Sequence, residues 1–521
     1  MNTTPRKLMG LLPSLAVLLL VAACGTNPVT KKKEIQFVSE SQEIKMGQGN
    51  YGPARQSQGG DYDLDKELTA YIREVGGKLA AVSDRQLPYE FALLNESVPN
   101  AWAMPGGKIA INRGLLYEMK SEAELAAVLG HEIVHAAARH GAKSMERGVL
   151  LQGAILAVGI GTGNSAYSNL YVQGAQVAAQ LTATKYGRNA ELESDLYGMN
   201  YMKKAGYDPR GAIHLQETFV RLSQGQKANA FEALFASHPP SEERVAKNRE
   251  TAARLGEGGI MGEDTYQKKT AYLRKTKPAY DAHREAVQAL AKGDRNTASS
   301  KAAQALAIEP REARFVELLG DIDMSAGKFE SAVGYYSDAI RLQDNYFKPY
   351  VQSGIAFYQL KRKDDAERNL ARSIELMPTA PGHYFLGLIR EEKGDLKTAM
   401  QHYQVAAGSQ SEIGQRAAMR YMKHDLPQNR DRYFQTGIQP QADGTLVGLV
   451  KNASPVPLTG IKVRMVRVVN NQIVDQTNVV SIAGTLKPGE IGKASMAKVQ
   501  LQNEEQLRAY RLVVEAANVV E

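Results

Sequence analysis

The sequence contains a single cysteine, Cys24, in 521 residues. A disulfide within the chain is therefore impossible, and packing and hydrogen bonding must hold the fold together. A large excess of charge is also lacking: 64 Lys and Arg stand against 56 Asp and Glu, a net charge of +8, and no basic stripe is interleaved with aromatic residues. This balance argues against nucleic acid as a partner. It supports at most a weak attraction to anionic lipid surfaces.

No apolar run is long enough to cross a bilayer, which takes about 20 residues. Near the N-terminus, two basic residues precede the apolar run Leu8–Leu20, and the lipobox Val21-Ala22-Ala23-Cys24 follows directly. We therefore predict a lipoprotein signal peptide over residues 1–23, lipidation of Cys24, and a lipidated tether over residues 24–45. The alternative is a cleaved secretory signal with a soluble product. A second apolar run, residues 149–160, is also too short to span and predicts a buried or interfacial helix.

Histidine is scarce, with nine in the chain, yet two histidines stand one helical turn apart in His131-Glu132-Ile133-Val134-His135. On an α-helix, positions i and i+4 lie on one face, so both imidazoles can reach one metal ion. Glu132 lies beside them, where its carboxylate can take a proton from water whose pKa a zinc ion lowers towards about 7. The preceding segment, residues 121–129, indicates a capping box that leads into an apolar-periodic helix. The pattern predicts one zinc ion per chain with Glu132 as general base; the alternative is two surface histidines on an ordinary helix.

Two histidines and a water leave tetrahedral zinc one protein ligand short, and the carboxylates of the run 188–195 are candidates. Together with the histidine motif, this run resembles the ExxxD element of the gluzincin family of zinc metallopeptidases that contains CAAX-prenyl endopeptidases and BepA-type periplasmic proteases. The resemblance implies that Glu191 is the third ligand and that Asp195, one turn later, orients a ligand histidine. We expect Glu193 to be a solvated charge. Helical phase predicts that His140 faces away from the metal.

Two further segments resemble the same family. Residues 100–115 are similar to its segment before the zinc helix, in which an edge strand would hold an extended substrate by backbone hydrogen bonds. The residues of that strand would be Lys108, Ile109, Ala110, Ile111 and Asn112. A plain hairpin that packs the helix is the alternative. His238 resembles the histidine of the family's His-Pro loop near the metal, so we expect it to cap the zinc or stabilise an oxyanion, with helix N-capping by the loop as the alternative.

From about residue 278 the chain repeats itself every 34 residues. The same interval relates small residues at fixed points: Ala298, Ala332 and Ala366. Small residues there allow two antiparallel helices to pack closely, which resembles the tetratricopeptide repeat, with Ala332, Tyr336 and Ala339 at its packing positions. We predict four units over about 278–412, the last one residue short, in a solenoid domain of residues 278–425. Its concave face would hold a peptide or a partner protein; bracing the peptidase domain is the alternative.

Beyond residue 425, apolar and polar residues alternate, which is the period of β-strands. The segments 445–450 and 461–466 indicate strands, and turn residues occur at 454–457, 470–471 and 487–490. Several short strands in about 90 residues predict an antiparallel β-sandwich over residues 430–521, with contact to another protein as its expected role. The predicted fold is thus multi-domain and mainly α. It combines an α+β zincin-type metallopeptidase domain over 46–255, a linker over 256–277, the α-solenoid and the β-sandwich.

The sequence predicts a zinc-dependent endopeptidase of the bacterial cell envelope. Gly25, after the lipidated cysteine, favours the outer membrane and a position facing the periplasm; an inner-membrane lipoprotein is the alternative. The resemblance implies that its substrates are unfolded or misassembled envelope proteins, with the β-barrel assembly machinery as a candidate partner of the repeats. A function of a different class is a chaperone-like scaffold lipoprotein, whose repeats bind envelope partners and whose peptidase site is latent.

Overall fold

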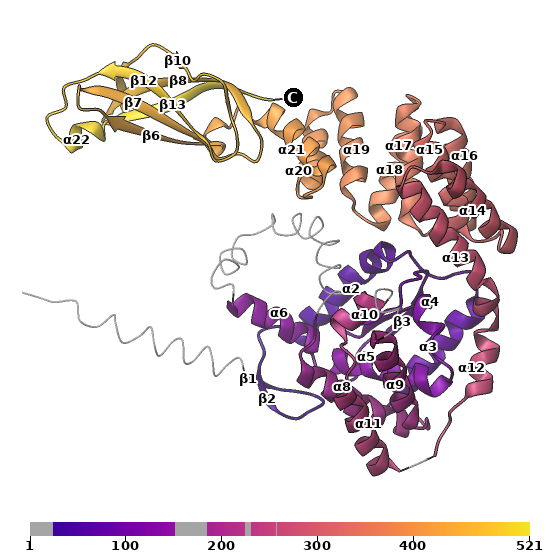
Figure 1. The fold of residues 1–521 in the computed structure, drawn as a ribbon. Helices are drawn as coiled ribbons and strands as arrows, with labels where there is room; N and C mark the ends of the chain where they lie inside the picture. Colours follow the sequence, from indigo (N-terminus) through magenta and orange to yellow (C-terminus); the bar gives the residue numbers. More distant parts are fainter. Residues whose placement is uncertain (1–23, 152–184, 225–230, 257, 521) are drawn as a thin grey trace, which may run out of the picture. The chain divides into compact units, whose positions relative to one another are not determined.

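The computed structural model describes residues 24–151, 185–224, 231–256 and 258–520. The chain divides into two compact units, Met1–Pro378 and Thr379–Glu521. The first unit contains the domain with the histidine motif and six repeat helices, and the second contains three repeat helices and a β domain (Figure 1). The predicted signal peptide lies outside the described residues, as does most of the second apolar run.

The sheet of the first domain has three strands in the order β3 (Glu90–Leu94), β5 (Lys108–Asn112), β4 (Ala101–Met104). Strand β5 pairs with β3 in parallel and with β4 antiparallel. The predicted edge strand Lys108–Asn112 is therefore the central strand, and that prediction is wrong. Both of its backbone edges are hydrogen-bonded and all five residues are buried, so no free edge remains for a substrate.

Helices surround this sheet. Before the histidine motif come α2 (Glu40–Ser57), α3 (Lys66–Ala80) and α4 (Arg113–Leu116). The motif lies on α5 (Glu122–Ala137), and α6 (His140–Leu151) follows it. Among the described residues, the domain continues with α8 (Arg188–Lys204), α9 (Arg210–Gln224), α10 (Glu232–Ser237) and α11 (Glu242–Leu255). The expected linker range holds α12 (Glu263–Lys269) and the start of the first repeat helix, and Tyr266 of α12 is fully buried.

Helix α5 begins where the sequence indicated. The hydroxyl of Ser121 accepts a hydrogen bond from the backbone N–H of Glu124 (3.2 Å), and the Glu124 carboxylate accepts one from the backbone N–H of Lys120 (2.6 Å). These two bonds satisfy backbone N–H donors at the start of the helix. In a regular capping box the Glu124 carboxylate would accept from the backbone N–H of Ser121, whereas here it accepts from Lys120. Every residue of α5 is buried, because α5 lies between the sheet and the other helices of the domain.

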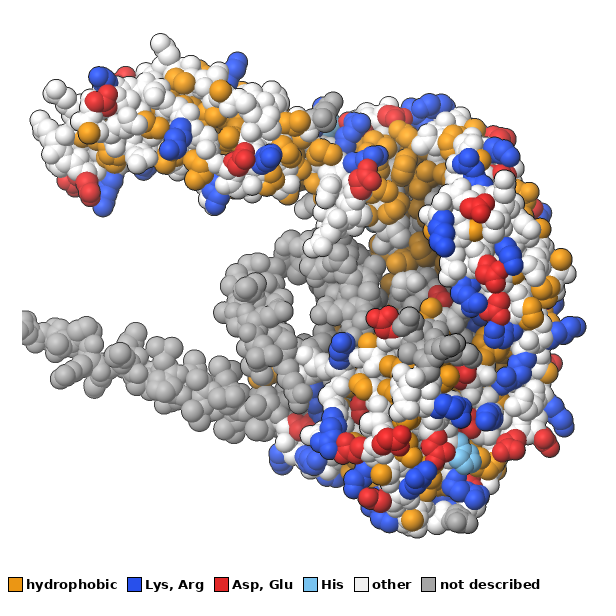
Figure 2. Space-filling view, viewed as in Figure 1, with side chains coloured by type: hydrophobic (Ala, Val, Ile, Leu, Met, Phe, Trp, Pro, Cys, Tyr) orange, Lys and Arg blue, Asp and Glu red, His pale blue; other side chains and the backbone are white. Residues whose placement is uncertain are grey.

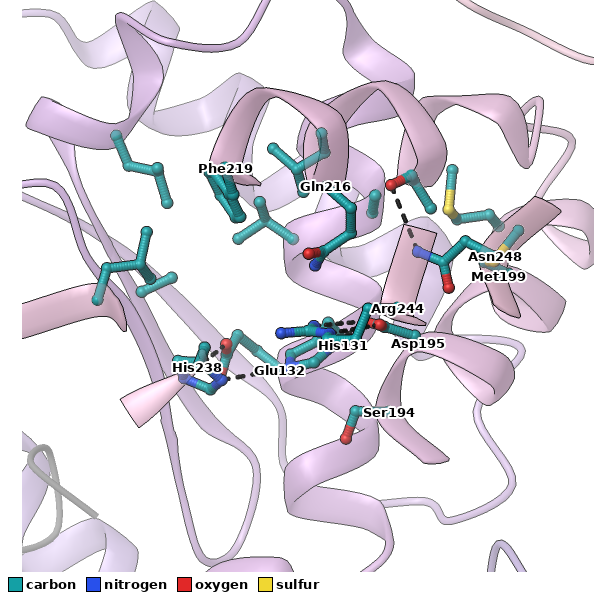
Figure 3. A pocket seen from close by; sticks show the side chains of 18 residues that line it. His131, Glu132, Ser194, Asp195, Met199, Gln216, Phe219, His238, Arg244 and Asn248 are labelled. Atoms are coloured by element: carbon teal, nitrogen blue, oxygen red, sulfur yellow. Dashed lines mark hydrogen bonds and ion pairs between the residues drawn. The ribbon is translucent and has the colours of Figure 1, made fainter. Parts of the chain in front are cut away.

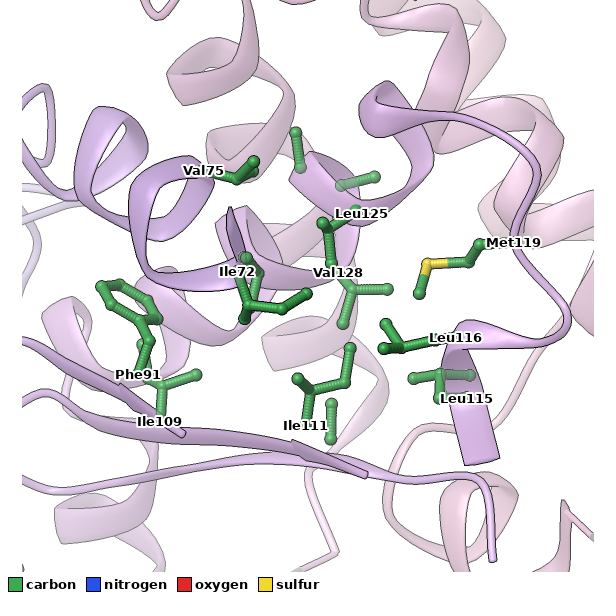
Figure 4. Close-up of a cluster of buried hydrophobic side chains, with 14 of the residues drawn as sticks. Ile72, Val75, Phe91, Ile109, Ile111, Leu115, Leu116, Met119, Leu125 and Val128 are labelled. Carbon is green, nitrogen blue, oxygen red and sulfur yellow. The ribbon is translucent and has the colours of Figure 1, made fainter. Parts of the chain in front are cut away.

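The core beneath α5 fixes the position of its metal-facing residues. Figure 4 shows Ile72 and Val75 of α3 and Ile109 and Ile111 of β5 meeting the α5 side chains around Val128. Apolar side chains from the helix, the sheet and the 115–119 segment pack together there, and burial of this kind contributes about 25 cal/mol per Å² of apolar surface. The histidine motif therefore lies on a helix held from several sides, which limits how far its side chains can move.

A two-stranded antiparallel hairpin, β1 (Cys24–Thr26) and β2 (Lys33–Ile35), precedes α2. It packs on the domain rather than extending from it as a free tether. Val29 is buried in the domain core, and the side-chain amide of Asn27 donates to the backbone carbonyl of Ala138 (3.1 Å). Lys143 of α6 pairs with Glu34 at 2.8 Å. The residues that follow Cys24 are therefore part of the domain surface next to the end of α5.

The repeat helices of the first unit form antiparallel pairs. The pairs are α13 (Ala271–Ala291) with α14 (Arg295–Ile308), α15 (Ala313–Ser325) with α16 (Phe329–Leu342), and α17 (Phe347–Gln359) with α18 (Lys363–Leu376). Helices α14, α16 and α18 begin 34 residues apart, and Ala332, Tyr336 and Ala339 are fully buried. A Cβ on Gly320 would lie 2.5 Å from the Tyr336 ring, which explains the small residue there. These observations confirm the predicted α-solenoid of tetratricopeptide type.

The first repeat pair is joined to the domain that carries the histidine motif by a buried polar cluster. The Glu312 carboxylate accepts hydrogen bonds from the amide of Asn95 (3.1 Å) and the hydroxyl of Tyr280. The Arg113 guanidinium lies 3.4 Å from the Tyr280 ring centroid and donates to Asn95. Because buried polar groups are costly when unpaired, this cluster ties the repeats to the domain specifically.

The second unit contains α19 (Ala380–Glu392), α20 (Leu396–Ala407) and α21 (Glu412–Asp425). Helix α20 starts 33 residues after α18, so the fourth repeat is one residue short, as predicted. Two antiparallel sheets follow. One has the order β12 (Ile491–Lys498), β7 (Thr445–Asn452), β6 (Phe434–Pro440).

In the other sheet, β8 (Leu458–Val469) pairs with β9 (Gln472–Gln476), β10 (Val480–Ser481), β11 (Thr485–Leu486) and β13 (Tyr510–Val519). Side chains from both sheets share one apolar cluster, which confirms the predicted β-sandwich. Asn470 and Asn471 have φ of +51° and +62°, the left-handed backbone that a tight hairpin turn between β8 and β9 requires.

Charges of both signs are interspersed on the face of the described residues that Figure 2 shows, in keeping with the small net charge. Among the described residues, the helices are either too short or too polar to cross a membrane.

Candidate metal centre

The two histidines of the motif point towards the same carboxylate. His131 Nε2 lies 3.5 Å from one oxygen of Glu191, and His135 Nε2 lies 3.3 Å from the other. The two Nε2 atoms are 2.9 Å apart. Helix α5 supplies both histidines and α8 supplies Glu191, so the site joins two helices distant in sequence, as the family resemblance implied.

Two glycines allow these helices to approach each other. A Cβ on Gly130 would lie 3.2 Å from the backbone oxygen of Gly198, and a Cβ on Gly198 would lie 3.1 Å from the backbone nitrogen of His131. Any larger residue at either position would push the helices apart. The close contact directly precedes His131 and therefore determines how near Glu191 comes to the histidines.

His238, which follows α10, lies in the same cluster. Its Nδ1 is 3.3 Å from His131 Nε2 and 3.2 Å from Glu191 Oε1, and its Nε2 is 3.6 Å from Glu132 Oε1. His131, His135, Glu191 and His238 each offer one ligand atom, and these four atoms lie within 4.8 Å of one another. The loop histidine thus reaches the centre of the site, as the capping hypothesis expects, while Ser241 serves as the N-cap of α11.

Asp195 and Arg244 support the cluster from behind. Asp195 Oδ1 lies 2.9 Å from His131 Nδ1, which is the contact expected of a carboxylate that orients a ligand histidine. Arg244 of α11 donates to both oxygens of Asp195 at 2.7 Å and pairs with Glu191 at 2.9 Å. The role of Arg244 was not predicted from the sequence. Its position six residues after His238, in the same loop and helix start, was the available signal.

The outer contacts of His135 differ from the predictions. His140 is not one of the four possible ligands, in keeping with the prediction, but its Nδ1 is 2.9 Å from His135 Nδ1, so it packs behind a ligand histidine. Helical phase did not predict this contact because α5 ends at Ala137 and the chain turns at Arg139 before α6 begins. Glu193 is not simply solvated either, since its Oε2 is 3.5 Å from His140 Nε2 and its side chain is 24% exposed.

The ring of Tyr186 stacks on His135, with centroids 3.8 Å apart and an interplanar angle of 25°. No signal in the sequence singled out this tyrosine. Its backbone N–H donates to the carbonyl of Ser237 at 3.5 Å, so it links the start of α8 to the loop of His238. The stacking covers one face of His135 and restricts the rotation of its ring.

The carboxylates of the site have strongly perturbed pKa values. Burial raises the pKa of Glu132. Burial also acts to raise the pKa of Glu191, but the neighbouring His238 and His131 outweigh it and hold that pKa well below its usual range. The pKa of Asp195 is lowered in the same way, because Arg244 outweighs the effect of burial. A buried carboxyl with a raised pKa next to ionised ones is a common arrangement for a general base.

The two motif histidines respond in opposite directions. Burial lowers the pKa of His131, but the charge of Glu191 and the hydrogen bond with Asp195 outweigh it and raise that pKa to about 10. Burial holds the pKa of His135 well below its usual range. The cluster therefore attracts positive charge at His131.

The donor set fits a zinc ion. Two imidazole nitrogens and a carboxylate oxygen on converging helices are the ligands of catalytic zinc sites, and a metal cation can replace the proton that His131 attracts. Glu132 Oε2 is buried without a hydrogen-bond partner among the described residues, which leaves it free to accept one. A glutamate beside three ligands of this kind can act as a general base in hydrolysis.

A cavity of about 30 Å³ adjoins these residues (Figure 3). Leu215 and Phe219 of α9 and Leu234 of α10 contribute its apolar side, and His131, Glu132, His238 and Arg244 contribute its polar side. This volume holds about one water molecule, not a peptide. With His238 in its present position, the described residues leave little room beside Glu132.

Residues 65–252 match the family model described as "Peptidase family M48". The match covers most of this domain and about a third of the chain. The match confirms the resemblance that the histidine and glutamate motifs predicted, and it covers the candidate ligands, Glu132 and His238. These residues, called the M48 domain below, are thus similar to a metallopeptidase domain, and the repeats and the β-sandwich follow them in the chain.

Three relatives show how far the similarity extends. The chain is 30% identical over 228 residues to "Mitochondrial metalloendopeptidase OMA1" of Schizosaccharomyces pombe, which is 43% of this chain and 65% of that protein. It is 25% identical over 320 residues to "Beta-barrel assembly-enhancing protease" of Escherichia coli, 56% of this chain and 65% of that protein. It is 28% identical over 209 residues to "Metalloprotease YcaL" of Escherichia coli, 40% of this chain and 76% of that protein. The chain thus spans less than two thirds of the first two relatives.

Proposed function

We propose that the protein is a zinc-dependent endopeptidase of the bacterial cell envelope, with one zinc ion per chain held by His131, His135 and Glu191. The observation that carries the proposal is the convergence of these ligand atoms, within 4.8 Å of one another, with Asp195 oriented on His131. The similarity of the domain to a metallopeptidase family supports the same reaction class.

The bound zinc ion supplies Lewis-acid chemistry: it acidifies water and polarises a carbonyl group. Glu132 receives the proton and passes it to the leaving amine. Its position directly after His131 and its raised pKa suit a group that must gain and lose a proton near neutral pH. Asp195 and Arg244 keep His131 and Glu191 in place during this transfer, through contacts of 2.7–2.9 Å.

We assign His238 as a plug. Its imidazole is within 3.6 Å of His131, Glu191 and Glu132 at once, so it occupies space that a substrate carbonyl needs. The site is then latent until the loop at 237–240 moves. A role in oxyanion stabilisation is compatible with the same histidine once a substrate displaces it.

An extended substrate would pair with β4 rather than with the predicted strand 108–112. Among the described strands, β4 pairs only with β5, so one of its backbone edges carries no strand partner. All four residues of β4 are buried, so a substrate would pair there only after the groups that cover the strand have moved. It also contacts the zinc helix α5. Strand addition at such an edge supplies main-chain hydrogen bonds that are independent of the substrate's sequence.

For location we propose lipidation at Cys24, anchoring to the outer membrane and a position facing the periplasm, on the basis of the lipobox and Gly25. The Escherichia coli relative that matches over 320 residues is named for enhancing β-barrel assembly. By analogy, the clients of this chain are unfolded or misassembled envelope proteins, and the repeat solenoid binds them or the β-barrel assembly machinery.

The decisive experiment uses the purified full chain. Zinc is quantified by atomic absorption, and cleavage of an unfolded model protein is followed beside Glu132→Gln, His238→Ala and the control Glu217→Gln on the exposed surface of α9. We expect a chelator to abolish cleavage and Glu132→Gln to lower it by roughly 10²–10⁴-fold without loss of zinc. His238→Ala should raise cleavage, and Glu217→Gln should behave as wild type.

The second candidate function is the scaffold lipoprotein with a latent site, and the position of His238 in the centre of the cluster favours it. It predicts stoichiometric zinc with no cleavage by the wild type or by His238→Ala. That outcome would transfer the biological role to the repeats. In cells, full rescue of a deletion by Glu132→Gln would point the same way.

A further inference from the structure

The chain turns sharply behind the second histidine of the motif. Helix α5 ends at Ala137, and Arg139 adopts a φ of +63°, a left-handed conformation that is uncommon outside glycine. This turn brings His140, the first residue of α6, back against His135. Their Nδ1 atoms are 2.9 Å apart, and their ring planes meet at 73° with centroids 4.9 Å apart. Both side chains are buried, with 1% of His135 and 4% of His140 exposed.

The direction of the hydrogen bond between His135 and His140 follows from which nitrogen of His135 faces the other candidate ligands. His135 Nε2 points to Glu191 and to His131 Nε2, so this nitrogen must be unprotonated to bind a cation. The remaining proton of His135 then resides on Nδ1 and is donated to His140 Nδ1. Because that nitrogen of His140 accepts, the His140 proton resides on Nε2, the atom 3.5 Å from the Glu193 carboxylate.

The two ligand histidines therefore have different supports. His131 donates its Nδ1–H to a carboxylate, Asp195, whereas His135 donates to a neutral imidazole. Glu132, Glu191 and Asp195 already bring three buried carboxyl groups to the site. An imidazole acceptor orients His135 without adding a fourth negative charge.

Groups outside the site hold His140 in this orientation. The Glu193 carboxylate of α8 lies 3.5 Å from His140 Nε2, an electrostatic contact longer than a close hydrogen bond, and Lys32 of the β1–β2 hairpin pairs with Glu193 at 3.1 Å. The Asn27 amide donates to the carbonyl of Ala138 at the turn itself. Lys32 is 70% exposed, so its ion pair contributes little alone, whereas the buried Asn27 contact fixes the backbone that carries His140.

We propose that His140 is a positioning residue for the metal centre: it accepts the Nδ1–H of His135, thereby fixes the tautomer and ring orientation of that ligand, and is itself held by Glu193 and the hairpin. This inference rests on the proposed zinc site. Loss of such an outer contact costs metal affinity, typically 10–100-fold, even though the residue does not touch the ion.

The test measures zinc affinity by chelator competition, not activity. His140→Phe keeps an aromatic ring of similar size and removes the acceptor, so we expect zinc to bind about 10–100-fold more weakly. His140→Gln retains an acceptor oxygen and should restore most of that affinity. His214→Gln, a change at an exposed histidine of α9, is the matched control and should leave the affinity unchanged. The unfolding midpoint of each metal-free variant reports whether the fold has survived.

Glu193→Lys provides a second route that does not disturb the buried core. A lysine at this position replaces the carboxylate near His140 Nε2 with a positive charge, which disfavours the N–H on that nitrogen and should weaken zinc binding. Glu217→Lys on the exposed face of α9 should not weaken it. The proposal is overturned if His140→Phe and Glu193→Lys both bind zinc as tightly as wild type. It is also overturned if His140→Gln loses as much affinity as His140→Phe, because the side chain would then serve packing alone. Absence of zinc binding by the wild type would overturn the proposed function itself.

Discussion

Replacing Arg244 with methionine removes a buried guanidinium from between two carboxylates. Arg244 is 4% exposed and donates to both oxygens of Asp195 at 2.7 Å, with a third contact of 2.9 Å to Glu191. Methionine fills a comparable apolar volume but leaves both carboxylates buried without this cation. In the metal-free protein, the neighbouring histidines are then the positively charged partners that the described residues offer these carboxylates.

The magnitude follows from the burial of the whole group. An exposed ion pair contributes about 0–1 kcal/mol, whereas removing one partner of a buried pair costs about 3–5 kcal/mol because an uncompensated charge stays buried. We therefore expect Arg244→Met to lower the free energy of unfolding of the metal-free M48 domain by about 3–5 kcal/mol. Arg244→Lys should recover only part of this loss, since lysine keeps the charge but not the two-pronged geometry.

Tryptophan fluorescence provides the assay. The chain has one tryptophan, Trp102, which is buried in β4 of the M48 domain, so its emission during urea denaturation reports on this domain alone. The control is Arg249→Met, five residues later on the same helix. Arg249 pairs with Glu217 at 2.6 Å, but the two side chains are 64% and 42% exposed, and the expected loss is below about 1 kcal/mol. Equal shifts for the two methionine variants would refute the reasoning.

Two further predictions concern the repeats. Gly320→Ala places a Cβ 2.5 Å from the Tyr336 ring and should destabilise the solenoid by about 1–3 kcal/mol. At Gly334 a Cβ would have no neighbour within 4 Å, so Gly334→Ala should be neutral or stabilise α16 by up to about 1 kcal/mol. Thermal unfolding followed by helix circular dichroism compares the two variants, and a lower midpoint for Gly334→Ala than for Gly320→Ala would contradict this prediction. Burial, aided by His402, lowers the pKa of His383 from 6.5 to about 4. The unfolded chain therefore binds this proton at a higher pH than the folded protein does, so the free energy of unfolding is unaffected above pH 6.5 and decreases as the pH falls towards 4. His383→Gln should remove up to about 3 kcal/mol of this pH dependence, and an unchanged slope between pH 6.5 and 4 would contradict the assignment.

Features with a local period were readable from the sequence. The i, i+4 spacing of His131 and His135 needs only one helix, and the 34-residue interval needs only a repeated helix pair; both are present in the structure. Glu191 required the family resemblance, because nothing local says which carboxylate of the run 188–195 turns inward. The Gly130–Gly198 contact that determines this is a property of two helices at once.

Features that depend on which distant segments pack together could not be predicted from the sequence. The run Lys108–Asn112 has the composition of a strand, but whether a strand is central or at an edge depends on which segments pair beside it. Helical phase did not predict the contact of His140 with His135, because a left-handed residue, Arg139, lies in the turn two residues after α5 ends. Tyr186 and Arg244 carry no periodic signal, and their roles arise only from contacts with residues about 50 positions away.

The hairpin of β1 and β2, packed on the domain, affects which proteins can reach the site. Asn27 is bonded to the turn that follows the zinc helix, and Cys24 lies three residues before it. With an acyl chain on Cys24, at most about 10 Å of backbone separates the lipid from the end of α5. The active site would then work against the bilayer surface itself, and a client would be cut while it is still at the membrane, before it escapes into the surrounding compartment.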